Sequence, residues 1–427
     1  MNMEVRALQG SEKLQQVTEL IGLLEKDLKD KSLKSPHLLT KYGVNGDTVD
    51  IRCAALRCVA NALLLDPEMR QLFVETGYGG RIAEMLKSDS SEDEMVTSRI
   101  LFLSTYDTTM DFEDLINNHS LGENVNYSGK KPLSQMDELA LTDTLKLIFN
   151  VSKLYPDLAA AFAPSIPYIF KIISRIDIPE KPLDGLLSYL INCLSTLDLE
   201  NKKGKPFENS PLFPTFNQNC NVDKLINILD QATSLYSPSD LETKAIPLLH
   251  SLIAIYELAP DGPRKYMEWL LLPEDNDRSR PIGQSDTLSS KLLKLSTAPY
   301  ANLKTAICEL MFTLSGKNAE NLTKNIGYGF AAGLLASRGM EIPQTAGEAF
   351  AAEKFDPEVN PITGQRWDAE KQDTGPPMTK EEKEREAERL FVLFERAKAN
   401  GLLNVENPVT QALQEGRLQE LPDSDSD

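Results

Sequence analysis

The sequence lacks the side chains that most enzymes and metalloproteins place at their centres. Its 427 residues include only three histidines, His37, His119 and His250, and no two of them lie close enough in sequence to suggest a metal motif. None of the five cysteines forms a pair with the two-residue spacing of a zinc or redox motif. We therefore expect no catalytic residue, no bound metal and no cofactor.

Features of disulfide-stabilised and membrane proteins are also scarce. An odd number of scattered cysteines fits reduced thiols in a cytosolic protein. Cys53 and Cys58 do not align on one helix face, so we interpret them as small core residues. No apolar stretch approaches the roughly 20 residues that span a bilayer. The N-terminus has no signal-peptide core, and Asn2 stands where myristoylation needs glycine, so we expect a cytoplasmic protein without a transmembrane segment.

Motifs for phosphate binding and acyl transfer are missing as well. Gly-Tyr-Gly occurs at 77–79 and 327–329, but neither copy follows a predicted strand. The sequence contains no Gly-x-x-x-x-Gly-Lys-Ser/Thr loop and no Gly-x-Ser-x-Gly elbow. We interpret both Gly-Tyr-Gly segments as turns that break one helix before the next begins.

Acidic residues outnumber basic residues. The chain has 64 acidic and 45 basic side chains and a formal net charge of -19. Such a charge repels a phosphate backbone, so we expect no nucleic-acid partner. The acidity fits two interpretations, which the composition leaves open: a partner with basic patches, bound in a salt-sensitive way, or a charge that only keeps a large protein dispersed.

Helical periodicity is what the sequence has in abundance. Apolar residues recur every three or four positions and predict helices near 14–28, 50–65, 92–105, 135–154, 182–197, 221–234, 238–258, 284–296 and 299–314. Short connectors with Pro, Gly, Asn or Ser are expected at 35–36, 43–46, 297–299 and 315–316. Many short-linked amphipathic helices in a row predict an all-α fold, an armadillo/HEAT-like α-solenoid superhelix.

Asparagines interrupt three of the apolar helical stretches, at Asn61, Asn150 and Asn192. A buried amide must find hydrogen-bond partners. Either it bonds a neighbouring loop carbonyl, or the three asparagines line a concave groove and bond the backbone of a partner protein. Arg57 and Arg99 either share that surface or are ordinary solvated charges.

The composition changes near the C-terminus. We assign 1–340 to the solenoid, 341–377 to an extended strap, 378–415 to a C-terminal helical segment and 416–427 to an acidic disordered tail. Thr379 and Glu382 predict a capping box for a helix that ends at Gly401, and 408–413 predicts a further short helix. The tail serines Ser424 and Ser426 suit an acid-directed kinase. A second acidic serine cluster, at 88–94, is interpreted as a solvated loop.

Three segments together resemble the synembryn family, named for resistance to inhibitors of cholinesterase. They are Ile326-Gly-Tyr-Gly-Phe-Ala-Ala-Gly-Leu-Leu-Ala336 with Arg338-Gly339, then Asn360-Pro-Ile-Thr-Gly364, then Met378-Thr-Lys-Glu-Glu-Lys-Glu-Arg-Glu-Ala-Glu-Arg-Leu390. The form of the helices is similar to that of fungal members. The chain departs from the family at Phe330, where an asparagine is common, and in a shorter spacer after Met340.

The resemblance implies a monomeric superhelix that binds G-protein α subunits (Gα). It further implies a folding chaperone for nascent Gα and an exchange factor that promotes GDP release. Such proteins contact the GTPase domain, hold the C-terminal helix of Gα in a concave groove and are recruited to the cell cortex or membrane through Gα. The family's acid-directed kinase sites correspond to Ser424 and Ser426.

Two other functions fit a helical repeat protein. A generic armadillo-type adaptor for extended peptides would carry repeated Trp–Asn pairs, whereas only Trp269 and Trp367 are present and neither accompanies the three asparagines. The other function is an enzyme with an unfamiliar helical active site, which a screen for bound metal or nucleotide would test, and we expect neither.

Overall fold

The computed structural model describes residues 34–46, 48–88, 90–122, 133–200, 210–340, 359–360, 362–370 and 379–399. Within these ranges the regular structure is helical, apart from one isolated antiparallel bridge between Val359 and Arg366. The chain divides into two units, Met1–Glu370 and Lys371–Asp427, and each is described by itself. None of the described helices is long and apolar enough to cross a membrane.

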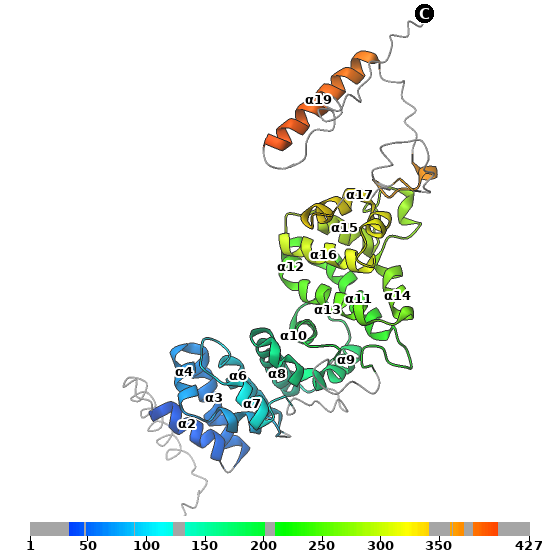
Figure 1. Ribbon diagram of the computed structural model, residues 1–427. Helices are drawn as coiled ribbons and strands as arrows, with labels where there is room; N and C mark the ends of the chain where they lie inside the picture. The colour runs from blue at the N-terminus through cyan, green and yellow to red at the C-terminus, as the bar shows by residue number, and fades with distance from the viewer. Residues whose placement is uncertain are drawn as a thin grey trace, which may run out of the picture. The chain divides into compact units, whose positions relative to one another are not determined.

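Unit 1 is a succession of short helices (Figure 1). They are α2 (Lys34–Asn45), α3 (Val49–Leu65), α4 (Glu68–Glu75), α5 (Gly79–Met85), α6 (Ser91–Leu103), α7 (Phe112–His119), α8 (Gln135–Leu154), η1 (Pro156–Ser165), α9 (Ile166–Arg175), α10 (Gly185–Leu194), α11 (Cys220–Leu235), α12 (Pro238–Lys244), α13 (Ile246–Leu258), α14 (Asp261–Leu271), η2 (Asp277–Ser279), α15 (Leu288–Ser296), α16 (Ala301–Leu314), α17 (Ala319–Ser337) and η3 (Trp367–Ala369).

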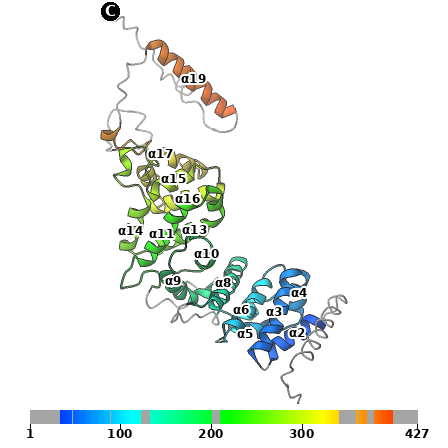
Figure 2. The same ribbon diagram turned by 180° about the vertical axis from the view of Figure 1, so that it is seen from behind.

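A row of central helices runs through this unit. α3 packs on α6, α6 on α8, α8 on α10, α10 on α13 and α13 on α16 (Figure 2). The remaining helices contact this row locally, as α5 does with α6, α9 with α10 and α15 with α16. Packing between successive neighbours defines a solenoid, so the predicted all-α, armadillo/HEAT-like fold is confirmed.

The sequence of α3 shows why these segments form helices. The Thr48 side chain accepts a hydrogen bond from the Ile51 amide and caps the first turn. Apolar side chains at three- and four-residue spacing are buried on one side: Cys53, Leu56, Val59, Ala60 and Leu63. The helix ends where Asp66 takes an extended conformation before Pro67.

Some predicted boundaries were wrong. Residues expected to be connectors lie inside α2, which begins at Lys34 and continues through Gly43. Gly43 is needed there because an added Cβ would lie 2.4 Å from Leu56 Cδ2 in the crossing helix α3. The predicted helix 238–258 is two helices, α12 and α13, separated at Ala245, since Pro247 cannot donate within a continuous helix. Cys53 is buried as expected, whereas Cys58 is exposed.

Both Gly-Tyr-Gly segments interrupt helices, as predicted. At 77–79 the break lies between α4, which ends at Glu75, and α5, which begins at Gly79. At 327–329 Gly327 has a non-helical backbone, at φ 73° and ψ 151°, and it separates the two helical parts of α17 at a kink. An added Cβ at Gly327 would lie 2.8 Å from the Ile362 carbonyl oxygen, so only glycine suits both the backbone and the contact.

This contact joins two of the segments that carry the family resemblance. The Gly329 amide donates to the Ile362 carbonyl at 3.0 Å, and the Ile282 amide donates to the Thr363 carbonyl at 3.0 Å. Arg278 connects them further, because its guanidinium donates to the carbonyls of Gly364 and Asn325, each at 3.0 Å. The described part of the predicted strap, 359–360 and 362–370, is therefore hydrogen-bonded to the helices of unit 1. The domain boundaries at 340, 377 and 415 stay predictions.

Unit 2 contains α19 (Lys380–Ala399). Its predicted capping box is confirmed: the Thr379 amide donates to Glu382 Oε2 at 3.0 Å, and the Glu382 amide donates to Thr379 Oγ1 at 3.3 Å. Leu390, Phe391, Val392 and Leu393 are exposed along it. Gly401, the short helix expected at 408–413 and the serines Ser424 and Ser426 lie outside the described residues.

The same substitution at two positions of α3 tests the packing. Leu63 is 1% exposed and Leu65 is 83% exposed. Leu63→Ala should lower the free energy of unfolding by about 2–5 kcal/mol, because it leaves a cavity in the core. Leu65→Ala, the matched control, should change it by less than about 0.5 kcal/mol. Urea denaturation followed by circular dichroism measures both, and equal effects would contradict the assigned burial.

Candidate protein-binding surface

The central helices α3, α6 and α8 lie parallel and in register. Near their N-terminal ends, Cys53 of α3 contacts Asp93 of α6, and Ser91 of α6 donates to Asp137 of α8. Near the C-terminal ends of α6 and α8, Asn150 Nδ2 donates to Thr105 Oγ1 at 2.8 Å. Side chains at matching positions of neighbouring helices therefore lie side by side.

We call the surface along these helices the open face. It consists of side chains at three-, four- and seven-residue spacing along the helices, and all of them except the buried Asp143 are half-buried or exposed. Its members are Arg57, Asn61 and Leu64 of α3, Arg99 and Phe102 of α6, Asp143, Lys146, Phe149, Asn150 and Lys153 of α8, and Tyr189 and Asn192 of α10.

The open face brings together all five residues that the sequence suggested for partner binding. Asn61 is exposed, and Asn150 and Asn192 are half-buried. Asn150 bonds a side-chain hydroxyl, that of Thr105, and not the loop carbonyl that we had considered. The side-chain amides of Asn61 and Asn192 make no hydrogen bond within the part of the chain that the structure describes, so they can bond an incoming backbone.

The two arginines have different surroundings. Arg57 Nη2 lies 3.2 Å from Glu92 Oε2, and both side chains are nearly half exposed, so this pair contributes little to stability. Arg99 Nη2 lies 2.6 Å from Asp143 Oδ2, and the Asp143 side chain is only 2% exposed. Arg99 is therefore a fixed part of the surface and not an ordinary solvated charge.

Buried aspartates hold the central helices in register at two successive steps. Asp93 of α6 is 1% exposed and lies 2.6 Å from Arg52 of α3. It also accepts from the Cys53 thiol at 3.3 Å, and burial raises the pKa of that thiol to about 12, so it stays protonated as a donor. Asp143 of α8 pairs in the same way with Arg99 of α6, and its other carboxylate oxygen lies 3.0 Å from Lys146 Nζ.

These aspartates were missed by the sequence analysis, although a signal was present. Each is a carboxylate at an apolar-periodic position of its helix, where an unpaired charge would be costly. The interpretation of 88–94 as a solvated loop was wrong, because residues 91–94 form the first turn of α6. Ser90 caps that helix by accepting from the Asp93 amide at 3.3 Å.

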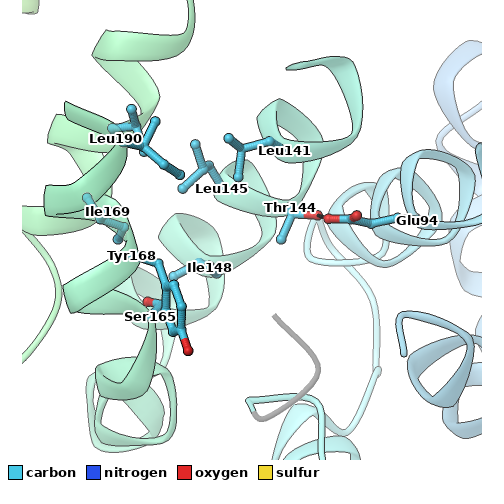
Figure 3. A pocket seen from close by; sticks show the side chains of 10 residues that line it. Glu94, Leu141, Thr144, Leu145, Ile148, Ser165, Tyr168, Ile169 and Leu190 are labelled. Carbon is cyan, nitrogen blue, oxygen red and sulfur yellow. Dashed lines mark hydrogen bonds between the residues drawn. The ribbon is translucent and has the colours of Figure 1, made fainter. Parts of the chain in front are cut away.

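Behind the open face lies a narrow, mostly apolar cleft between α6, α8, α9 and α10 (Figure 3). Leu141, Leu145, Ile169 and Leu190 line it, and Glu94 points toward Thr144, whose hydroxyl donates to Glu94 Oε1 at 3.1 Å. Burial raises the pKa of the Glu94 carboxyl above its ordinary value. The other polar groups that line the cleft are the hydroxyls of Ser165 and Tyr168.

The fold defines a class of protein, a helical repeat scaffold, and the open face is its candidate site. Among the described residues, no group of three His, Cys, Asp or Glu side chains could hold a metal ion. The adaptor alternative needs tryptophans beside the asparagines, but Trp269 lies on α14 and Trp367 in η3.

Comparison with known proteins identifies the family. Residues 17–417 match the family model described as guanine nucleotide exchange factor synembryn, Ric8. The chain therefore belongs to the synembryn family.

Several relatives are curated as chaperones. The chain is 25% identical to the chaperone Ric-8A of Rattus norvegicus, over 89% of this chain and 79% of that protein. It is 24% identical to a synembryn-like chaperone of Schizosaccharomyces pombe, over 66% of this chain. That match spans 56% of the yeast protein, less than two thirds of its length. Among solved structures, a designed armadillo repeat protein is 12% identical with a TM-score of 0.39, covering 66% of this chain and 100% of its own.

The buried aspartate of α8 can be tested by substitution. Asp143→Ala should lower the free energy of unfolding by about 3 kcal/mol, because Arg99 and Lys146 lose their shared carboxylate. The matched control is Asp230→Ala, which breaks the more exposed pair with Lys291, at 2.8 Å, and should cost less than about 1 kcal/mol. Chemical denaturation compares the two, and a smaller loss for Asp143→Ala than for the control would contradict the assigned role.

The Glu94 carboxyl predicts a pH dependence of stability. Its pKa is raised in the folded state above the ordinary 4.5, so the folded state holds this proton more tightly than the unfolded chain does. The stabilisation is present below pH 4.5 and is lost as the pH rises through the raised pKa. Glu94→Gln, which stays neutral, should therefore raise the urea midpoint at pH 7 and leave it unchanged near pH 4.5. Glu113→Gln, exposed on α7, is the control, and parallel shifts in both variants would refute the prediction.

Proposed function

We propose that this protein binds Gα subunits, acts as a folding chaperone for nascent Gα and promotes GDP release as an exchange factor. The open face carries the proposal. It offers half-buried rings at Phe102, Phe149 and Tyr189 beside the free amides of Asn61 and Asn192, on a chain that belongs to the synembryn family.

The partner segment that fits this surface is the C-terminal helix of Gα. Rings and alkyl groups would cover its apolar side, and the free amides of Asn61 and Asn192 would bond backbone groups left open at its end. The parallel central helices form a long, pre-arranged surface, so little ordering of the scaffold is needed on binding.

Exchange then follows from linkage and needs no catalytic residue. If the scaffold prefers nucleotide-free Gα, it must weaken nucleotide binding by the same factor. Holding the C-terminal helix away from its own GTPase domain supplies that preference. When GTP binds, Gα returns to its nucleotide-bound state and the scaffold is released, so exchange proceeds without a covalent step.

The remaining parts of the chain fit the same function. We propose that α19 and the segment before it contact the GTPase domain, and that an acid-directed kinase strengthens activity at Ser424 and Ser426. The protein would act as a monomer in the cytoplasm and reach the cell cortex or membrane only through Gα.

Nucleotide release from purified Gα tests the proposal. The protein should accelerate release of labelled GDP from GDP-loaded Gα and form a stable complex with nucleotide-free Gα. No acceleration together with no complex would exclude the function.

Substitution of the free amides tests whether the open face is the site. Asn61→Ala with Asn192→Ala should weaken Gα binding about thirtyfold, since each of the two lost hydrogen bonds is worth about 1 kcal/mol. Asn227→Ala, exposed on α11 and bonded to Gln231, should leave binding unchanged. Calorimetry measures affinity, and unchanged binding by the double variant would place the site elsewhere.

A further inference from the structure

A serine followed by a proline is exposed between α11 and α12. Ser237 and Pro238 are both exposed, and Leu235 just before them is 50% exposed. The backbone is extended at Tyr236, with φ -88° and ψ 149°, and at Ser237, with φ -66° and ψ 155°. This segment therefore presents a hydroxyl group and a proline to solvent in an extended form that the cleft of a modifying enzyme can bind.

The short helix α12, which begins directly after Ser237, caps the central helix α16. Glu242 Oε2 accepts from the Leu303 amide at 2.7 Å, and Glu242 Oε1 accepts from the Asn302 amide at 3.2 Å. Tyr300, the residue at the N-cap position of α16, makes no capping hydrogen bond with its own side chain. Amides in the first turn of a helix have no partner within the helix, so the position of α12 controls the first turn of α16.

The position of α12 depends in turn on the hydroxyl group of Ser237. Ser237 Oγ accepts from the Asp240 amide at 3.2 Å and donates to Asp240 Oδ2 at 2.6 Å. Lys244 is the only basic residue of α12, and it lies at the other end of the helix, where it pairs with Asp184 at 2.5 Å. The hydroxyl group that holds the first turn therefore faces a carboxylate of its own helix.

We propose that Ser237 is a phosphorylation site for a proline-directed protein kinase, and that phosphate there releases the cap that α12 provides to α16. The γ-phosphoryl group of ATP is transferred to Ser237 Oγ, its bond to the β-phosphate oxygen breaks, and ADP leaves. The hydroxyl proton passes to the general base of the kinase. Proline has no amide N–H, so a kinase pocket without an acceptor selects it. This covalent regulation goes beyond the proposed function and does not depend on Gα binding.

The phosphate has two opposing effects on α12. At a helix N-terminus it interacts favourably with the macrodipole, but α12 has only seven residues, so this effect is small. Against it, Asp240 Oδ2 loses the proton that it accepts from Ser237, and a charge of about -1.5 to -2 is placed beside its carboxylate. Repulsion therefore opens the first turn of α12, and Glu242 moves away from the amides of α16.

Phosphorylation of the full chain by a mitogen-activated protein kinase with ATP, mapped by peptide mass spectrometry, tests the site. Phosphate should appear at Ser237. Ser237→Ala should abolish it, whereas Ser239→Ala, at an exposed serine that no proline follows, should leave it in place. Ser210 is an internal comparison, because the proline after it, Pro211, is half-buried and its carbonyl accepts from Asn221 at 3.0 Å. No phosphate at Ser237, or phosphate at Ser210 in preference to it, would overturn the proposal.

Hydrogen–deuterium exchange of the phosphorylated full chain tests the consequence. The Leu303 amide should exchange about fivefold faster than in the unmodified protein, the effect of losing a helix cap. Glu242→Ala removes the same cap without phosphate, so it should give the same increase, and kinase treatment should add nothing to it. Ser237→Asp is no substitute for the phosphate, because aspartate is itself a good N-cap. Unchanged exchange at Asn302 and Leu303 after phosphorylation would show that the phosphate does not act on α16 and would overturn the proposed regulation.

Discussion

The buried carboxylates between consecutive central helices determine how the surface is arranged. Asp93 and Asp143 each accept a cation from the preceding central helix, Arg52 and Arg99 respectively, at 2.6 Å. A charge buried to this extent cannot tolerate a slip of its helix by one turn, because it would lose its partner. Helices α3, α6 and α8 therefore stay parallel and in register. Side chains seven residues apart lie on one face of each helix, and these faces adjoin on neighbouring helices.

Much of the fold could be predicted because helical periodicity is a local property. The burial of Leu56, Val59 and Leu63 in α3 follows from their spacing alone. Predictions of where a helix begins or ends failed where contacts between residues distant in sequence determine the boundary. Gly43 was expected in a connector but lies inside α2, where an added Cβ would lie 2.4 Å from Leu56 Cδ2 of α3. A local pattern cannot show that contact. Phe330, where the family commonly has asparagine, lies against Gly283, with its Cζ 2.8 Å from an added Cβ there.

The candidate site was predicted in part. Asn61, Asn150 and Asn192 were noticed because an amide among apolar residues needs an explanation, and the structure places all three on one face. Their different roles could not be read from the sequence, since the Asn150–Thr105 bond joins residues 45 positions apart. The position of Lys146 was missed for the same reason: its ammonium group lies near rings of α6 and α10, and no local pattern shows that.

The function that we propose depends on the open face and on no reactive group. Whether Gα covers the open face is therefore the decisive observation. Hydrogen–deuterium exchange of the full chain, alone and with nucleotide-free Gα, measures that directly. The account predicts slower exchange in α3, α6, α8 and α10, along which the open face lies. A complex that forms while these four helices exchange as fast as in the free protein would contradict it.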